Sequence, residues 1–291
     1  MCYNVAMEKI VQKSVLTDVH NHSKYSPDGV DKLEDMLSSA CERGVAYYGV
    51  SEHINYDLRF LGAPVINGAS ITTDEEEYFT AARKLQKEYE GKMQVLVGAE
   101  FGFLDEKKVW EEYLALAKEY QPDFIVNGLH VDGDDDYYSQ SGFYEQGQLK
   151  EKTVAYKEYF KLLRKSLDVP YPYDIVAHMG YCARYAPYED KEIHYQELPD
   201  EIDDVLKTII QKGKILEVNS SSNGLKSICI PNEEILRRYY ALGGREVSYA
   251  SDAHSTKSIM RNREKIVSLL KEIGFEYITV PYKGEKIKVK L

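Results

Sequence analysis

The positions of the histidines constrain the fold more than any other feature of this sequence. The chain contains seven histidines, and six of them directly follow short β-rich runs. These six are His20, His22, His53, His130, His178 and His254. Strand ends make up a small part of a chain, so random placement would rarely produce this pattern. The histidines therefore indicate one shared site in a fold that brings many strand ends together.

The β-rich runs alternate with charged, amphipathic stretches of helical length. The runs span 15–19, 46–50, 94–99, 123–127, 174–177, 214–218 and 246–250. The helical stretches span 31–44, 73–91, 107–120, 149–167, 199–212, 232–242 and 258–273. Such alternation predicts an α/β fold with a parallel sheet, either closed as a barrel or open and doubly wound. An open sheet would spread the six histidines along a row, whereas a barrel gathers all strand carboxyl ends on one face. We therefore expect a closed barrel.

Three carboxylates accompany the histidines at the same strand ends. Asp28 lies six residues after His22, Glu100 ends the third run, and Asp252 follows the seventh. Imidazole with carboxylate suits zinc, iron or manganese better than calcium or magnesium, which prefer oxygen ligands. Nine candidates exceed the three or four ligands of one catalytic zinc, which indicates two or three metals. The remaining histidine, His194, lies in a polar stretch and is expected to be an ordinary surface residue.

Composition excludes several classes of function. The net charge of −11 and the lack of a clustered Lys/Arg stripe argue against nucleic-acid binding. The one basic stretch, 283–290, alternates like an exposed edge strand. No window approaches the ~18 apolar residues of a membrane helix, and the N-terminus lacks a signal-peptide core. The four cysteines form no C-x-x-C pair, so we expect reduced thiols in a cytoplasmic protein.

The ordered motifs resemble those of the polymerase and histidinol phosphatase (PHP) superfamily. They are "HNH" with a following "SPDG", then "SEH", "GAEFGF", "NGLHVDG", "VAHMG" and "SDAHS". The stretches "HVDGDDDYY" and "LEVNSSS" are more similar to the histidinol-phosphatase branch than to the polymerase-associated branch. The resemblance covers about residues 15–256. It implies a distorted (β/α)7 TIM-like barrel, one domain over 1–291, a trinuclear metal site and phosphoester hydrolysis.

The family pattern also assigns ligands to positions of this sequence. It implies three metals, the first on His20, His22, Glu100 and Asp252, the second on Glu100, His130 and His178, and the third on Asp28, His53 and His254. Glu100 would be the bridge, and suitable residue types fill all nine positions. A water shared by two such cations is acidified toward hydroxide near neutral pH and can attack phosphorus. Glu100 and Asp252 are therefore predicted to be catalytic through the metals that they hold.

The remaining candidates would bind the substrate. Arg184, in the loop after the fifth run, is the first choice for offsetting charge on the phosphoryl oxygens and is also predicted to be catalytic. Arg59, in the long loop after His53, is the second choice. An acidic loop after His130 contains Asp132, Asp134, Asp135 and Asp136. This loop, with Asp132 as the named candidate, could recognise an amino cation such as that of histidinol phosphate. Asn219 lies beyond the sixth run, where it could contact the substrate or the residues that surround the metal ligands.

These observations favour a phosphomonoesterase with a small-molecule substrate and three first-row metal ions. The first reading is a histidinol-phosphatase that hydrolyses L-histidinol phosphate in histidine biosynthesis. The alternative is a phosphatase of the same superfamily that acts on a nucleotide or on phosphotyrosine. A nuclease and a non-enzymatic metal-binding module are less favoured, because the chain is acidic and all candidate ligands are intact. A panel of phosphomonoesters would separate these possibilities.

Overall fold

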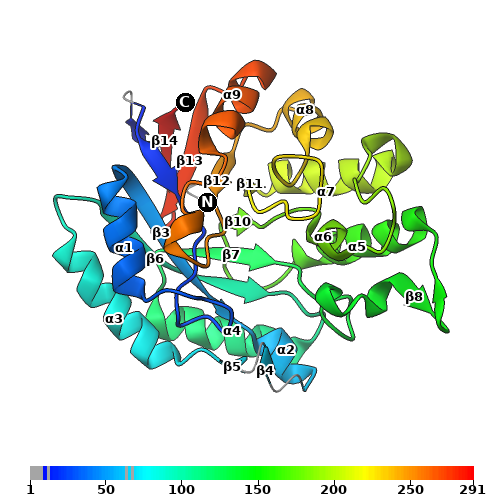
Figure 1. Ribbon diagram of the computed structural model, residues 1–291, viewed down its shortest axis with the longest axis horizontal. Helices are drawn as coiled ribbons and strands as arrows, with labels where there is room; N and C mark the ends of the chain where they lie inside the picture. The colour runs from blue at the N-terminus through cyan, green and yellow to red at the C-terminus, as the bar shows by residue number, and fades with distance from the viewer. Residues whose placement is uncertain (1–8, 12–13, 63–64, 67–68) are drawn as a thin grey trace, which may run out of the picture.

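The computed structural model describes residues 9–11, 14–62, 65–66 and 69–291 and shows a nearly closed parallel barrel (Figure 1). Its seven strands follow the order β12-β11-β10-β7-β6-β3-β2. They are β2 Leu16–Asp18, β3 Val45–Ile54, β6 Gln94–Gly102, β7 Phe124–Gly128, β10 Ile175–Val176, β11 Ile215–Asn219 and β12 Val247–Ala250. A parallel bridge between Asn21 and Ala253 joins the two ends of the sheet. The predicted barrel is thus confirmed, and it closes on the side where its strands end.

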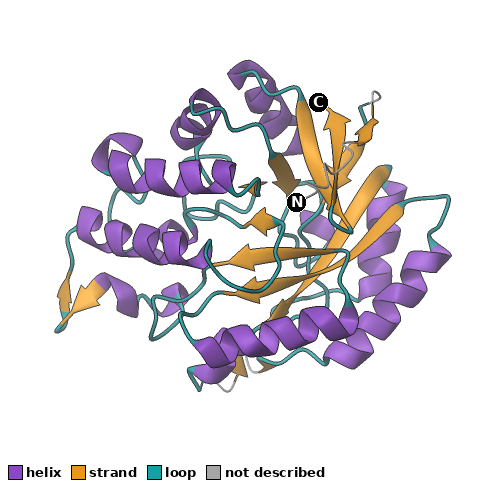
Figure 2. Cartoon of the chain, turned by 180° about the vertical axis from the view of Figure 1, so that it is seen from behind, coloured by secondary structure: helices purple, strands orange, loops and turns teal. Residues whose placement is uncertain are grey.

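Helices surround the strands, as Figure 2 shows from behind. They are α1 Leu33–Glu42, α2 Tyr56–Phe60, α3 Glu75–Glu88, α4 Lys107–Tyr120, α5 Lys152–Ser166, α6 Tyr181–Tyr185, α7 Pro199–Gln211, α8 Glu233–Ala241 and α9 Arg263–Ile273. Two small hairpins, β4 Val65–Ile66 with β5 Ala69–Ser70 and β8 Tyr144–Glu145 with β9 Gln148–Leu149, project from the connections. A side-chain cap begins α3: the Asp74 carboxylate accepts a hydrogen bond from the Glu77 backbone N at 2.9 Å.

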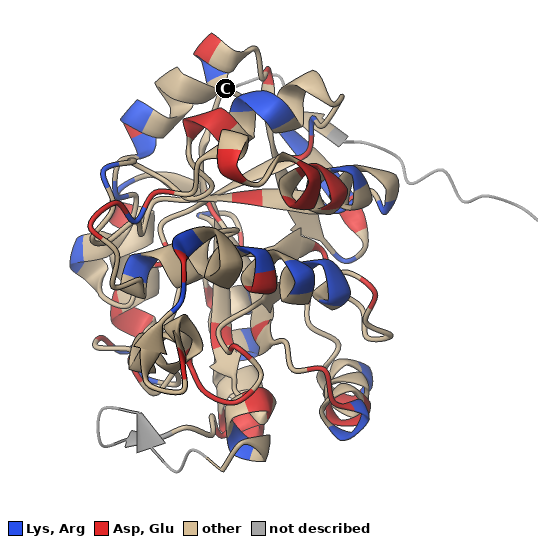
Figure 3. Cartoon of the chain, turned by 90° about the vertical axis from the view of Figure 1, so that its right-hand side faces the viewer, with Lys and Arg blue, Asp and Glu red and all other residues tan. Residues whose placement is uncertain are grey.

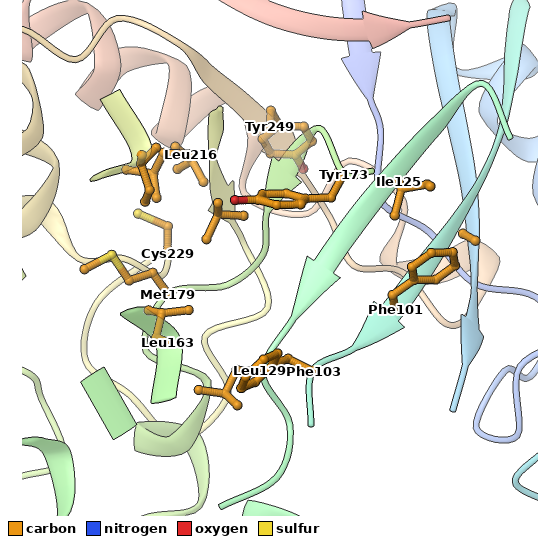
Figure 4. Close-up of a cluster of buried hydrophobic side chains, with 14 of the residues drawn as sticks. Phe101, Phe103, Ile125, Leu129, Leu163, Tyr173, Met179, Leu216, Cys229 and Tyr249 are labelled. Atoms are coloured by element: carbon orange, nitrogen blue, oxygen red, sulfur yellow. The ribbon is translucent and has the colours of Figure 1, made fainter. Parts of the chain in front are cut away.

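The main hydrophobic core lies between the strands and the surrounding helices. Figure 4 shows part of it, with side chains from β6, β7 and β11 and from α5. Phe101, Leu163 and Leu216 in this layer are each at most 1% exposed. The amphipathic pattern of the sequence therefore places one face of each long helix on the barrel.

A second, smaller core fills the barrel at the end away from the histidines. A three-stranded sheet of β1 Lys9–Val11, β14 Glu285–Lys290 and β13 Tyr277–Tyr282 packs there. Its Val280 shares a buried cluster with the strand residues Leu96, Phe124 and Ile175. A Cβ on Gly98 would lie 2.4 Å from the Phe124 ring, so the glycine makes room for that ring inside the barrel. The small sheet thus closes the amino-terminal end of the barrel.

This sheet corrects one expectation from the sequence. The basic stretch 283–290 was predicted to be an exposed edge strand, but β14 is the central strand of the sheet. It pairs in parallel with β1 and antiparallel with β13. Ile287, Lys288 and Val289 are buried, and the Lys288 ammonium pairs with Glu246. An amphipathic lysine can bury its stem in this way when its charge meets a carboxylate.

The outer surface is highly charged. Figure 3 shows acidic and basic residues interspersed along the outer helices on one side of the molecule. Cys41, Cys182 and Cys229 are free cysteines, while Cys2 lies outside the described residues. Among the helices of the described ranges, none combines the length and the apolar character needed to cross a membrane.

Candidate metal centre

All nine predicted ligands lie at the carboxyl end of the barrel. They come from β3 and β6 and from the connections that follow β2, β7, β10 and β12. They are His20, His22, Asp28, His53, Glu100, His130, His178, Asp252 and His254. Direct strand pairing contributes, because His53 of β3 and Glu100 of β6 are cross-strand partners. The structure therefore brings the whole predicted set together.

Glu100 occupies the middle of this cluster. Its Oε2 lies 3.1 Å from His20 Nε2 and 3.0 Å from His53 Nδ1. Its Oε1 lies 2.9 Å from His178 Nε2 and 3.2 Å from His130 Nε2. The side chain is 1% exposed. His22 Nε2 also lies 3.5 Å from Oε2, so one carboxylate meets five imidazoles, which is the arrangement expected of a bridging ligand.

Two further carboxylates flank Glu100. Asp252 Oδ1 lies 3.4 Å from His22 Nε2. Asp28 lies 3.0 Å from His254 Nε2 through Oδ2 and 3.7 Å from His53 Nε2 through Oδ1. Within the described residues, three overlapping groups have ligand atoms all within 4.8 Å of one another: His22, His53 and His254; His20, His22 and Asp252; and His53, Glu100 and His130.

The arrangement of the donor atoms suits a bound divalent cation better than it suits direct hydrogen bonds between these atoms. In the described part of the chain, several of them are buried without a hydrogen bond, namely His22 Nε2, His53 Nδ1, His254 Nε2 and Asp28 Oδ1. They face carboxylates or imidazoles at ion-pair distances but without hydrogen-bond geometry. Buried polar atoms without partners are costly. Nitrogen and oxygen donors in this mixture suit first-row divalent metals.

The carboxylates of the cluster outweigh burial and raise the pKa of His20, His53, His130 and His254. The pKa values of Glu100 and His22 shift in the opposite direction. Burial raises the pKa of Glu100, but His20, His53 and His130 outweigh this effect and hold it well below its usual range. The Glu100 carboxylate therefore stays ionised. Burial, with the neighbouring His53 and His254, holds the pKa of His22 well below its usual range. The His22 imidazole is consequently neutral, as a metal ligand must be.

Outer carboxylates that sequence reasoning missed hold the histidine rings. Glu217 Oε2 lies 2.6 Å from His20 Nδ1. The Ser26 hydroxyl lies 3.3 Å from His22 Nδ1 and donates to Glu52 at 2.5 Å. Both glutamates are 0% exposed. The signal in the sequence was a glutamate inside an apolar strand of a barrel, where a charge needs partners.

The backbone of the site is strained and closely packed. His178 has φ 22° and Asp252 has φ 51°, values that residues with a Cβ adopt at a cost of about 1–3 kcal/mol. A Cβ on Gly128 would lie 2.6 Å from Glu100 Oε1. Gly128 therefore leaves room for the bridging carboxylate. Such strain is concentrated at functional sites in folded proteins.

A cavity of about 610 Å³ opens above the cluster. Besides seven members of the cluster, its lining includes two arginines, two further acidic residues and three tyrosines: Arg184, Arg261, Asp135, Asp136, Tyr138, Tyr181 and Tyr185. The arginines belong to segments after β10 and β12, and the acidic residues to the loop after β7. The cavity can thus receive a small molecule that carries both an anionic and a cationic group.

Arg184 and Asn219 lie at different depths of this site. Arg184 Nη2 is 3.2 Å from Asp252 Oδ2 and 3.2 Å from Asn219 Oδ1, and the arginine also lines the cavity. Asn219 is 0% exposed and donates to Glu217 Oε1 and Asp252 Oδ2 at 2.7 and 3.2 Å. Asn219 therefore supports Arg184 and Asp252 from below, rather than lining the cavity as expected for a residue that contacts substrate.

Two predicted substrate contacts do not reach the cavity. Arg59 lies on α2 with its guanidinium 4.2 Å from the centre of the Tyr56 ring and pairs with Glu112 at 2.5 Å. Asp132 turns into its own loop, where it accepts from the Asp134 and Asp135 backbone N atoms at 2.9 Å. It lines a separate hollow of about 180 Å³. Local partners therefore hold both side chains away from the site.

Comparisons with known proteins identify relatives of this chain. Residues 18–221 match the PHP domain family. The chain is 29% identical over 270 residues to a probable histidinol-phosphatase from Clostridium acetobutylicum, covering 91% of this chain and 98% of the relative. It is 27% identical over 274 residues to a histidinol-phosphatase from Lactococcus lactis, covering 93% and 95% of the two chains.

The fold has a counterpart among solved structures. The histidinol phosphate phosphatase from Lactococcus lactis, solved in complex with zinc, L-histidinol and phosphate, superposes with a TM-score of 0.78 at 24% identity. The superposition covers 93% of this chain and 98% of that one. The two chains therefore share one fold over nearly their whole lengths.

Proposed function

The chain belongs to the PHP domain family, and we propose that it is a metal-dependent histidinol-phosphatase. The reaction would be hydrolysis of L-histidinol phosphate to L-histidinol and phosphate in histidine biosynthesis. The observation that carries this proposal is the cavity, which combines seven of the nine donor residues with two arginines and two further aspartates. The names of the relatives support the same substrate. The proposal includes one domain over residues 1–291 and a cytoplasmic location.

We propose three divalent cations for the donor cluster, with zinc, iron and manganese as candidates. His20, His22, Glu100 and Asp252 would hold the first, Glu100, His130 and His178 the second, and Asp28, His53 and His254 the third. Bound cations would supply an acidified water as nucleophile and positive charge for the phosphoryl oxygens. The Glu100 carboxylate is ionised, and its two oxygens together face five imidazoles, which supports its role as the bridge.

Arg184 would bind the phosphoryl group from the side of β10. Its side chain is 7% exposed and already contacts Asp252, so little reorganisation is needed to donate to a phosphoryl oxygen. The Tyr181 ring lies under its guanidinium at 5.2 Å and limits its movement. A fixed donor in a partly desolvated site stabilises developing charge more than a mobile one in water. Arg184 is therefore the protein group best placed to act on the transferring phosphoryl group.

The acidic loop after β7 would recognise the ammonium of the substrate. Asp136 lines the cavity, and burial raises its pKa although His130 opposes this effect. An ammonium beside it would offset the cost of keeping this carboxylate ionised. The neighbouring rings of Tyr181 and Tyr185, 5.2 Å apart, provide an aromatic wall for the imidazole of the substrate. Asp136 thus replaces Asp132 as the candidate for ammonium binding.

A substrate panel with metal-loaded protein tests the proposal. L-histidinol phosphate, a nucleoside monophosphate, phosphotyrosine and an aryl phosphate would be compared by kcat/KM. We expect L-histidinol phosphate to be preferred by at least ~10²-fold, because the wrong substrate leaves buried polar groups unpaired. Better cleavage of another ester would overturn the substrate and retain the phosphomonoesterase. Failure to cleave any of them would favour a non-enzymatic metal-binding module, and cleavage of a phosphodiester would favour a nuclease.

A further inference from the structure

Glu217 of β11 is a buried carboxylate with an unusual set of partners. Its side chain is 0% exposed, and it points into the barrel beneath the donor cluster. Oε2 accepts from His20 Nδ1 at 2.6 Å, while Oε1 accepts from the His178 backbone N at 3.0 Å and from Asn219 Nδ2 at 2.7 Å. Within the described residues, its one ion pair is with His20. No lysine or arginine of that part of the chain neutralises it.

This environment would make a purely structural glutamate expensive. Burying a carboxylate costs several kcal/mol unless opposite charge and hydrogen bonds repay it. Apolar residues face the same barrel interior from β11 and its neighbours, such as Ile215 and Ile175. An apolar side chain would therefore satisfy packing at position 217 without that cost. The carboxylate is explained if it acts on the ligands above it.

The contact with His20 determines which ring nitrogen is free. A carboxylate can only accept, so Glu217 holds a proton on Nδ1. With a cation bound in place of the Nε2 proton, Nε2 would supply the lone pair that the cation requires. That Nε2 lies 3.1 Å from Glu100 Oε2 and 3.9 Å from Asp252 Oδ1. The second oxygen of Glu217 fixes the backbone N of His178, another member of the cluster. One side chain thus orients ligands from two different strand ends.

We propose that Glu217 is a positioning residue that holds His20 in the Nδ1-protonated form, with Nε2 directed at the cation position next to Glu100 and Asp252. This inference rests on the metal centre of the proposed function and names a residue outside its ligand set. Carboxylates that hold the second nitrogen of a metal-bound histidine orient the ring and strengthen it as a ligand. Glu217 would therefore be needed for metal affinity although it does not touch the metal.

Glu217→Gln tests this role because an amide cannot replace the carboxylate at this position. Three donors meet the two oxygens of Glu217. If the amide oxygen faces the His178 N–H and Asn219, the amide NH₂ faces His20 Nδ1 and favours the Nε2-protonated ring. If the amide is turned over, its NH₂ opposes two donors. Either orientation disturbs the ligands while preserving the size of the side chain.

Zinc affinity of metal-stripped protein, measured by competition with a chromophoric chelator, gives the first readout. We expect Glu217→Gln to bind zinc ~10–100-fold more weakly than wild type. The matched control is Asp123→Asn. Asp123 directly precedes β7, is 1% exposed, and its carboxylate accepts a hydrogen bond from the Val97 backbone N at 2.9 Å. This substitution should lower thermal stability and leave zinc affinity unchanged. Equal zinc affinity of wild type and Glu217→Gln would overturn the inference.

Long-range ¹⁵N–¹H NMR spectra of the imidazoles give the second readout, which is taken from the wild-type protein. In the zinc-loaded wild type, His20 should carry its proton on Nδ1, and a proton on Nε2 would overturn the inference. The signal can be assigned from its loss in His20→Asn. If the wild type itself binds no zinc, the proposed metal centre fails and this role with it. If the wild type binds zinc and Glu217→Gln binds it equally well, only the role of Glu217 fails.

Discussion

Glu100 lies between residues from four neighbouring strand ends because β6 is near the middle of the sheet. Removing its negative charge takes the shared oxygen ligand from two proposed cations at once. We predict that Glu100→Gln loses bound metal and lowers kcat by at least ~10²-fold, since the cations also stabilise the transition state. Elemental analysis and steady-state kinetics on the same sample would measure both effects.

His194 supplies the control for this substitution. It lies outside the cluster, 35% exposed, and its Nε2 is 2.9 Å from Asp190 Oδ2. His194→Ala should retain metal and turnover, with a stability change within about 1 kcal/mol. Equal losses in Glu100→Gln and His194→Ala would mean that the cluster is not the catalytic centre.

The two arginines named from the sequence can be compared directly. Arg184 lines the cavity beside Asp252, whereas Arg59 pairs with Glu112 on the outer surface. Arg184→Ala should lower kcat by ~10²-fold, because its contact with the phosphoryl group strengthens as charge develops. Arg59→Ala should leave kcat and KM unchanged. A larger effect of Arg59→Ala in steady-state kinetics would reverse this assignment.

The acidic loop after β7 gives a similar pair. Asp136 lines the cavity, and Asp132 accepts hydrogen bonds within its own loop. An aspartate that binds the ammonium equally in ground and transition states contributes to KM alone. Asp136→Asn should therefore raise KM for L-histidinol phosphate and leave kcat nearly unchanged. Unaltered KM for an aryl phosphate without an ammonium is the internal control, and a fall in kcat alone would contradict this role.

Among the elements, α7 and α8 are joined by a carboxylate whose effect depends on pH. Asp203 of α7 accepts from Arg238 Nε of α8 at 2.7 Å and pairs with Lys207 at 3.0 Å. The hydrogen bonds from Arg238 lower the pKa of Asp203 from 3.8 to about 2. A lowered pKa in the folded state means that this stabilisation is complete above the unfolded value and is lost as pH falls through about 2.

We therefore predict that Asp203→Asn lowers the free energy of unfolding by about 1 kcal/mol at neutral pH. The pKa shift alone would correspond to a larger value, but solvent screening at the partly exposed Arg238 reduces it. The difference from wild type should shrink as pH falls below about 4. Thermal unfolding of both proteins across this range would measure it. A difference that stays constant down to pH 2 would show that the charge on Asp203 contributes no stability.

The elements themselves were largely predictable from the sequence. Each of the seven apolar runs became a strand of the barrel, because a parallel barrel buries both faces of its strands. Strand lengths were less accurate: β3 extends to Ile54 and β6 to Gly102, so His53 and Glu100 lie within strands. The apolar pattern of these two runs stops at polar residues, whereas the backbone hydrogen bonds of the strands continue past them. Residues after His53 also form the short helix α2, where a loop was expected.

At the scale of the whole molecule, the two ends of the barrel have different tasks. The small sheet of β1, β13 and β14 closes one end with apolar side chains, and the donor cluster occupies the other. Active sites of such barrels lie at the carboxyl ends of the strands, while the opposite face contributes stability. The position of the small sheet could not be predicted, because the pairing of β1 with β14 joins the two ends of the sequence.

The sequence also could not reveal what the residues that support the site from below contact. Glu52 and Glu217 lie inside apolar strands, and their partners come from segments far away in the chain. Local patterns contain no information on such contacts. Likewise, the sequence could not show whether Asp132 or Asp136 faces the cavity, because the turns of the loop backbone determine this. The residue types at strand ends therefore predicted the proposed metal ligands, but they did not predict the residues that orient those ligands.

A crystal structure of the protein with zinc and inorganic phosphate, analysed by anomalous scattering at the zinc edge, tests the proposed metal centre most directly. We predict three anomalous peaks at the carboxyl end of the barrel. One should lie among His20, His22 and Asp252, a second between His130 and His178, and a third among Asp28, His53 and His254, with Glu100 shared by the first two. A single peak, or peaks away from these residues, would contradict the trinuclear centre.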